Sequence, residues 1–234
     1  MIGVIAVVIP ARDESELVGR CLASVLAAKR FVESRVPEVA VTVTLVADRC
    51  TDDTADVARG FAGVTVAEID AGNVGLARAT GVMLALESSG TLPDGVWIAS
   101  TDADSVVPAG WLVEQARLAR DGVGVVLGTV RPDLADLTPE QAEAWARLHS
   151  GDRALGEVHG ANLGVRADLY LAAGGFPGLP EHEDVTFVER CAANGATIVA
   201  TDRGEVTTSG RQVGRTPGGF ARYLRDDLLP NHAR

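Results

Sequence analysis

The segment WIASTDADS, Trp97–Ser105, decides how the rest of the chain is interpreted. The apolar run Val96–Ala99 predicts a short buried strand, and two carboxylates, Asp102 and Asp104, follow at its carboxyl end. Side chains two residues apart point to the same side of an extended segment, and paired carboxylates suit Mg²⁺ or Mn²⁺ when substrate phosphates supply further ligands. The alternative is a loop in which either aspartate caps the next helix or forms a turn. The pair alone does not decide between the two, and the surrounding pattern is needed to choose.

The first hundred residues alternate between apolar runs and amphipathic segments. β-Branched runs predict strands, and apolar residues at helical spacing predict the helices between them. Strands are expected at Ile5–Ile9, Val41–Ala47 and Val64–Glu68, with helices over Glu14–Ala28, from Thr51 as N-cap to the Gly60 region, and in the segment ending at Leu86. Short connections between such elements are typical of a largely parallel sheet with helices on both faces. We therefore expect an α/β fold in which Val96–Ala99 is the fourth strand.

The second half is less regular, although no linker, repeat or low-complexity tract interrupts it. Thr138 and Gln141 predict a capping box, with Pro139 in the first helical turn. Further helices are expected over Trp111–Ala119, Asp168–Ala172, Glu183–Asn194 and Phe220–Leu229, and strands at Val123–Val130, Leu163–Arg166, Thr197–Ala200 and Glu205–Thr208. A single domain over residues 1–234 is the simplest organisation of this pattern.

Composition excludes several classes of function. The net charge of −11 argues against general nucleic-acid binding, which normally needs a basic surface. No apolar run reaches the ~20 residues of a membrane span, and the apolar start of the chain lacks the length and charge of a signal peptide. Cys21, Cys50 and Cys191 are odd in number and lack metal-ligand spacing, so we expect reduced cysteines in a cytoplasmic protein.

Polar or glycine-containing segments follow the first three predicted strands. Residues 10–14 (PARDE) follow the first, Asp48 follows the second and residues 72–78 (GNVGLAR) follow the third. Because the carboxyl ends of parallel strands meet at one edge of a sheet, these segments are expected to converge with the aspartate pair on one crevice. Each segment alone has a simpler interpretation as a helix start or a turn. The glycine pattern of dinucleotide-binding folds and the Walker loop are both missing.

Seven short motifs occur in a fixed order along the chain. They are VIPARDE at 8–14, VAD at 46–48 with TDDT at 51–54, GNVG at 72–75, TDAD at 101–104, HGANLGVR at 159–166, GGF at 174–176 and EDVTF at 183–187. In order and spacing they resemble the family-2 glycosyltransferases of the GT-A fold. The resemblance implies a GT-A domain over 1–234, with a nucleotide-binding half (1–105) and an irregular acceptor-binding half (106–234).

The resemblance also implies an activity: transfer of a sugar, with inversion, from a UDP- or GDP-sugar to a small or soluble hydroxyl acceptor. It implies a divalent cofactor, Mn²⁺ or Mg²⁺, held through Asp104, and Asp184 as general base. The donor-binding residues that it implies are Pro10, Ala11, Arg12, Glu14 and Asp48 around the nucleoside, and Gly72, Asn73, Arg78, Asp102 and Ala103 near the ribose and diphosphate. The residues implied on the acceptor side are Gly160, Ala161, Asn162 and Glu183.

Three assignments stay open when only the residues are considered. Glu183 and Asp184 both suit the first turn of a helix, so spacing does not tell which of them is the base. His159 is a candidate metal ligand, because imidazole binds transition metals, or else a hydrogen-bonded surface side chain. Arg211 and Arg215 lie in a glycine-containing loop that either closes over the diphosphate or stays solvated.

Several alternatives accompany this interpretation. The membrane-spanning tails and Q-x-x-R-W signature of the family's polysaccharide synthases are absent from the sequence, so we expect single transfer rather than processive synthesis. A homodimer is one way to add acceptor-binding surface. The rival functions are a non-catalytic or partner-dependent module of the same fold, and a sugar nucleotidyltransferase, whose glycine- and lysine-rich loop residues 10–14 lack. Trp97, Trp111 and Trp145 are expected in the core, with a sugar platform as the alternative for one of them.

Overall fold

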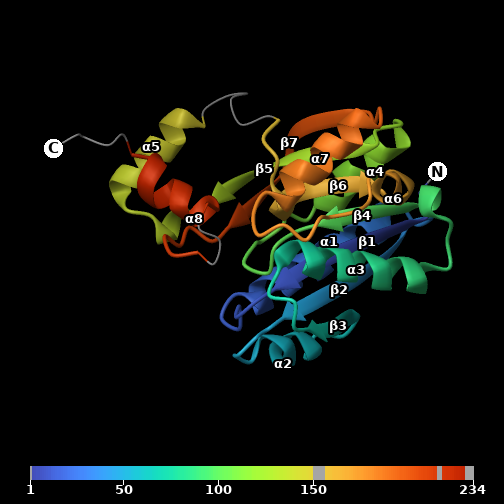
Figure 1. The fold of residues 1–234 in the computed structure, drawn as a ribbon, viewed down its shortest axis with the longest axis horizontal. Helices are drawn as coiled ribbons and strands as arrows, with labels where there is room; N and C mark the ends of the chain where they lie inside the picture. Colours follow the sequence, from blue (N-terminus) through green and yellow to red (C-terminus); the bar gives the residue numbers. More distant parts are fainter. Residues whose placement is uncertain (1, 150–155, 215–217, 230–234) are drawn as a thin grey trace.

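The computed structural model describes residues 2–149, 156–214 and 218–229. Within these ranges the chain forms a seven-stranded sheet with the order β3-β2-β1-β4-β6-β5-β7 (Figure 1). The strands are β1 (Val4–Ala11), β2 (Ala40–Asp48), β3 (Val64–Ile69), β4 (Val96–Ser100), β5 (Val125–Pro132), β6 (Leu163–Arg166) and β7 (Ile198–Thr208). Strand β6 runs antiparallel to both neighbours, and the other described pairs of strands are parallel. The predicted α/β fold with a mostly parallel sheet is confirmed.

Helices cover both faces of the sheet. One face carries α1 (Val18–Arg35), α2 (Thr54–Arg59) and α4 (Trp111–Arg120), and the other carries α3 (Val74–Ser89), α6 (Ala167–Ala172) and α7 (Glu183–Ala193). In β1, Ile5, Val7 and Ile9 belong to the first buried cluster, whereas Ala6 and Val8 belong to the second. Because successive side chains of a strand alternate between faces, one continuous apolar run supplies both cores.

Two predicted helix starts in the first half are wrong. Helix α1 begins at Val18 rather than Glu14, because residues 15–17 form a turn in which the Leu17 N–H donates to the Glu14 carbonyl (2.9 Å). Helix α2 has Asp53 and not Thr51 as its N-cap residue. The Thr51 hydroxyl donates instead to Asp13 Oδ1 (3.1 Å), so it ties the loop after β2 to the loop after β1.

The second half completes the same sheet. Two predicted strands form the single strand β7, in which Gly204 has φ +92° and the register against β5 shifts between Gly128 and Val130. The predicted capping box is present at the start of α5 (Pro139–Leu148). The predicted last helix is a short turn, α8 (Phe220–Arg222), followed by a π-helical turn, η5 (Tyr223–Asp227). Figure 1 shows α5 and α8 side by side at one end of the molecule, beyond the strands.

Short 3₁₀ turns connect some of these elements. They are η1 (Pro93–Gly95), η2 (Leu134–Asp136) and η4 (Gly160–Asn162). Across the described residues, no helix has the length and apolar character that crossing a membrane requires. The three cysteines are free thiols, as the sequence predicts.

Candidate active site

A cavity of about 760 Å³ lies at the carboxyl ends of β1, β2 and β4. The start of α7 and residues within 208–214 and 218–223 contribute to its other walls. The predicted site residues that line it are Pro10, Ala11, Arg12, Glu14, Asp48, Gly72, Asn73, Arg78, Asp102, Ala103, Asp104, His159, Gly160, Ala161, Glu183, Asp184 and Arg211. The structure therefore brings the segments that follow the parallel strands to one crevice, as the strand pattern predicts.

The two aspartates after β4 lie in a turn, as the alternative interpretation expected, and not in an extended segment. The Ser105 N–H closes this turn by donating to the Asp102 carbonyl (3.1 Å). Both side chains still reach the cavity, where Asp104 accepts a hydrogen bond from the Thr208 hydroxyl (3.2 Å). Burial and the nearby Asp102 carboxylate raise the pKa of Asp104 to about 6, although Arg211 lowers it. The turn thus holds more negative charge than its neighbours neutralise, and an added cation would stabilise the ionised pair.

Arg211 reaches these carboxylates from the segment that follows β7. Its guanidinium donates to both carboxylate oxygens of Glu14 (2.9 and 2.7 Å) and forms an ion pair with Asp104 (2.8 Å). A planar guanidinium matches a carboxylate in this two-pronged geometry. Arg211 is therefore part of the cavity and not a free side chain in a solvated loop. Arg215, predicted to act with it, lies outside the described residues.

Arg78 is the centre of a second, more deeply buried ion-pair network. The residue is 3% exposed, its Nη2 donates to Asp102 Oδ1 (2.6 Å), and its Nη1 donates to Glu183. Burial lowers the pKa of Arg78, but the Asp102 and Glu183 carboxylates raise it by more, so that it lies above its ordinary value. Gly160 lies against the guanidinium, where a methyl group would overlap it. Arg78 and Glu183 thus largely neutralise each other.

Asp184 lies in the first turn of α7 and is held by backbone amides. Its Oδ2 accepts from the Gly160 N–H (2.7 Å) and its Oδ1 accepts from the Val185 N–H (2.9 Å). The preceding His182 has φ +57°, a left-handed conformation that begins the helix sharply. Among the described residues no cation forms a salt bridge with Asp184, whereas Glu183 is bound to Arg78. Of the two acids, Asp184 is the one whose charge is left for a ligand.

Asp48 ends β2 and fixes the shape of the next loop. It is 3% exposed, and its carboxylate accepts from the N–H groups of Ala71 (2.8 Å), Gly72 (2.8 Å) and Asn73 (2.6 Å). The Asn73 side chain in turn caps α3 by accepting from the Leu76 N–H (3.0 Å). These bonds set the backbone of residues 71–73 along the cavity. That Asp48 also contacts a nucleotide base stays a prediction.

The other predicted donor residues and His159 occupy distinct positions on the lining. Arg12 is exposed, whereas Ala103 and Ala161 are buried in the wall. The Nε2 atom of His159 lies 3.5 Å from the Glu157 carboxylate. Burial lowers the pKa of His159, although Glu157 raises it, so the ring is mainly neutral at pH 7 and has a nitrogen lone pair. Its role as a metal ligand stays a prediction.

Asn162 does not line the cavity, which corrects the position expected for it on the acceptor side. Its Nδ2 donates to the carbonyls of Thr129 (2.8 Å) and Gly204 (3.0 Å), and its Oδ1 accepts from Trp111 Nε1 (2.8 Å). The side chain also lies so close to Gly128 that a Cβ there would overlap it. Asn162 therefore joins α4, β5 and β7 within the core.

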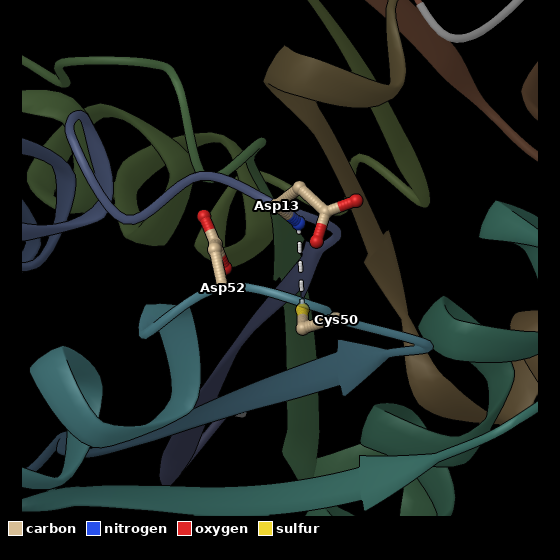
Figure 2. A group of neighbouring side chains, drawn as sticks. All are labelled: Asp13, Cys50 and Asp52. Carbon is tan, nitrogen blue, oxygen red and sulfur yellow. Dashed lines mark hydrogen bonds between the residues drawn. The ribbon is translucent and has the colours of Figure 1, made fainter.

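Asp13, Cys50 and Asp52 form a group of acidic and thiol side chains whose potential ligand atoms all lie within 4.8 Å of one another (Figure 2). The Asp13 N–H donates to Cys50 Sγ (3.4 Å), and Asp13 Oδ1 accepts from the Thr51 N–H (2.6 Å). Asp52 accepts from the Ser15 N–H (2.9 Å). Because these polar atoms bond one another and nearby amides, the group holds the loops after β1 and β2 together.

Four rings outside the predicted set of site residues also line the cavity, although a sugar platform was the alternative expected for one of the three tryptophans. The four rings are Trp145, His149, Phe220 and Tyr223. Trp145 was expected in the core, and it is 9% exposed in the structure. The available sequence signal was the i, i+4 spacing of Trp145 and His149 in a predicted helix, which places two rings on one helix face.

Comparisons with known proteins agree with the fold. A sequence model of glycosyl transferase family 2 matches residues 6–155, whereas no curated protein matches the chain. In structure the chain is similar to TarS from S. aureus, with 16% identity, a TM-score of 0.67, and coverage of 89% of this chain and 37% of TarS. It is also similar to the mannosyltransferase PcManGT from Pyrobaculum calidifontis in complex with GDP-Man and Mn²⁺, with 20% identity, a TM-score of 0.62, and coverage of 91% and 58%. A third similar structure is glucosyl-3-phosphoglycerate synthase from M. tuberculosis, with 16% identity, a TM-score of 0.55, and coverage of 94% and 77%.

The family match extends over more than half of the chain, so the protein belongs to glycosyl transferase family 2. The structural similarities show that its fold is the GT-A fold of these enzymes. The chain spans 37% of TarS and 58% of the mannosyltransferase.

Proposed function

We propose that the protein transfers a sugar from a UDP- or GDP-sugar to a hydroxyl group, with inversion, and that it depends on Mn²⁺ or Mg²⁺. The charge of the cavity carries this proposal. Among the described lining residues there are eight carboxylates and three arginines, of which Arg78 and Arg211 are already paired. A diphosphate entering such a cavity needs another cation to compensate for its charge.

The carboxylates of the turn after β4 suit that cation. Asp104 and Asp102 are oxygen ligands, and burial together with the charge of Asp102 raises the pKa of Asp104, so that ionised Asp104 gains from a positive partner. In the described chain, Asp102, Asp104 and His159 do not bring three ligand atoms within 4.8 Å of one another. The donor diphosphate would therefore supply the remaining ligands, as is usual for Mg²⁺ and Mn²⁺ bound with phosphates. A bound divalent cation would offset the charge that builds up on the leaving diphosphate.

The donor would lie along the loops that follow β1, β2 and β3. Backbone amides of residues 71–73 are fixed by Asp48, and Arg12, exposed on the lining of the same cavity, would contact the nucleotide. The structures of PcManGT with GDP-Man and Mn²⁺, and of the M. tuberculosis synthase with UDP and Mg²⁺, support this choice of donor and ion. These structures do not decide which nucleotide base or which sugar the donor of this protein carries.

Asp184 is the proposed general base. Its Oδ2 atom takes the proton of the acceptor hydroxyl while the acceptor oxygen bonds to the anomeric carbon. The bond from that carbon to the diphosphate oxygen breaks, and the nucleoside diphosphate leaves with the bonding electrons. The Gly160 N–H holds the carboxylate in place during this step, and the attack from the opposite face inverts the anomeric centre.

The test is Asp184→Asn, which keeps the size of the side chain and removes the base. The variant should bind the donor with Mn²⁺ as the parent does, yet transfer sugar at least about 100-fold more slowly. The anomeric configuration of the parent's product, read by NMR, should be opposite to that of the donor. Unchanged transfer by the variant, or retained configuration, would refute the mechanism. Donor binding without transfer to any acceptor or to water would favour a binding module.

A further inference from the structure

One wall of the cavity is built from rings that belong to α5, α8 and η5. The Trp145 and His149 rings stack with their centroids 3.5 Å apart and an angle of 12° between their planes. Phe220 and Tyr223 meet Trp145 edge-on at 5.8 and 6.3 Å. Trp145 is almost covered, whereas His149, Phe220 and Tyr223 are partly exposed. We call these four residues the aromatic wall.

The aromatic wall has its own supporting core, separate from the two cores of the sheet. Ala144 and Trp145 of α5 pack there against Leu224 and Leu228. Gln141, buried in the first turn of α5, donates from Nε2 to the Leu224 carbonyl (3.0 Å). Because the rings are fixed by packing and by this hydrogen bond, the wall is formed before any ligand binds, which lowers the entropy cost of binding.

Gln141 also connects the aromatic wall with the donor side of the cavity. Its Oε1 accepts from Gln212 Nε2 (2.8 Å), and the neighbouring Arg211 is bound to Glu14 and Asp104. On the other side, His149, His159 and Asp184 line the same cavity. The wall is thus continuous with the proposed base as well as with the proposed donor site.

The charges around the aromatic wall are negative. Glu157 and Glu181 line the same cavity together with Asp184. Among the described lining residues the cations are Arg12, Arg78 and Arg211, and the last two are held by carboxylates at the donor end. Because Arg12 belongs to the segment after β1, a phosphate or carboxylate group on the acceptor would meet more carboxylates than cations among the described residues around the aromatic wall, and the net effect would be repulsion.

We propose that the acceptor is a neutral sugar, which packs the C–H face of its ring on the aromatic wall and directs one hydroxyl to Asp184. Aromatic rings offer large apolar contact area, and acidic side chains accept hydrogen bonds from the hydroxyl groups around the rim of a sugar. The proposal rests on the glycosyl transfer proposed above and adds the class of acceptor to it. Within the wall, His149 and Tyr223 determine which acceptor is preferred, because Trp145 is mostly buried beneath other rings of the wall.

The test compares acceptors of different charge. With the UDP- or GDP-sugar that the protein binds, transfer is measured to methyl glucopyranoside and methyl mannopyranoside, and to glucose 6-phosphate and 3-phosphoglycerate. The neutral glycosides should be used with at least about a tenfold higher kcat/KM than the two phosphorylated acceptors. A preference for the phosphorylated acceptors would overturn this inference while leaving glycosyl transfer intact. No transfer to any of them and no donor binding would instead count against the proposed function itself, and this inference would fall with it.

Variants of the wall supply a readout that does not depend on turnover. In the Asp184→Asn protein with nucleoside diphosphate and Mn²⁺, binding of the preferred methyl glycoside is followed through tryptophan fluorescence. Tyr223→Ala should raise its dissociation constant about five- to tenfold, and Tyr223→Phe, which keeps the ring, should restore most of the affinity. Phe31→Ala, in α1 and away from the cavity lining, is the matched control for loss of a ring. Equal affinity of the Tyr223→Ala and parent proteins would refute the role of the wall.

Discussion

Replacing Arg78 by methionine should destabilise the protein by about 3–5 kcal/mol, because it leaves a buried carboxylate without its partner. The side chains of Arg78 and Glu183 are 4% and 7% exposed and form an ion pair, whereas Asp102, the other partner of Arg78, is 35% exposed and can be hydrated. The loss of stability therefore comes mainly from the buried Glu183 carboxylate, which is left without its partner. It is a large part of the ~5–15 kcal/mol that stabilises a typical domain.

The pH dependence of this loss has a definite sign. Burial raises the pKa of Glu183 above its ordinary value of 4.5, and the Arg78 guanidinium opposes that shift. Removing Arg78 must raise this pKa further, so the folded variant binds a proton that the unfolded chain has already released. Stability of the variant should then be greatest below pH 4.5 and should fall as pH rises through the folded pKa of Glu183.

Urea unfolding followed by tryptophan fluorescence measures both effects, at pH 5 and at pH 8. The double variant Arg78→Met/Glu183→Gln should recover most of the stability lost at pH 8, because it removes the unpaired charge. Arg117→Met is the control, since that exposed arginine makes only surface ion pairs. A loss below about 1 kcal/mol for Arg78→Met, independent of pH, would refute the reasoning.

Three further outcomes test other parts of the structure. Asn162→Ala should lower the free energy of unfolding by about 2–4 kcal/mol, since it leaves Trp111 Nε1 and two carbonyls without partners, and it should leave donor binding unchanged in a thermal-shift assay. Asp52→Asn should remove stability that is present above pH 4 and is lost toward pH 2. Although burial raises the pKa of Asp52, bonds from Thr54 and Ser15 lower it to about 2, and unfolding temperatures measured from pH 2 to 6 check this. Cys21, fully buried, should react with a thiol reagent only after unfolding.

The strands of the first half could be predicted because each is a continuous apolar run bounded by polar residues. Ile5–Ile9 and Val96–Ala99 are buried on both faces of the sheet, so local sequence alone indicates their structure. The N-cap of α2 could not be predicted in this way. Thr51 is a good capping residue by type, but its hydroxyl donates a hydrogen bond to Asp13, which the fold brings close to it. Such tertiary contacts override local preference.

The site was predictable to the extent that its parts follow strands. The segments after β1, β2, β3 and β4 meet at one edge of the sheet. This arrangement could be predicted because each segment follows a strand of a parallel sheet, and the carboxyl ends of parallel strands lie at the same edge. Asn162 follows Gly160 by two residues, yet its side chain lies in the core, where it forms hydrogen bonds with Trp111 and two carbonyls. The contact between the Trp145 and Tyr223 rings could not be predicted from the sequence, because the helices that carry them meet only in the folded protein.

The central claim is that the crevice binds a nucleotide sugar together with a divalent ion. Thermal unfolding of the protein with UDP-, GDP- and dTDP-sugars, each with and without Mn²⁺, tests it most directly, because a ligand that binds only the folded state raises the unfolding temperature. The structure predicts a rise with a UDP- or GDP-sugar that requires Mn²⁺ and is lost in Asp104→Asn. No rise with any donor, or an equal rise without the ion, would contradict the claim.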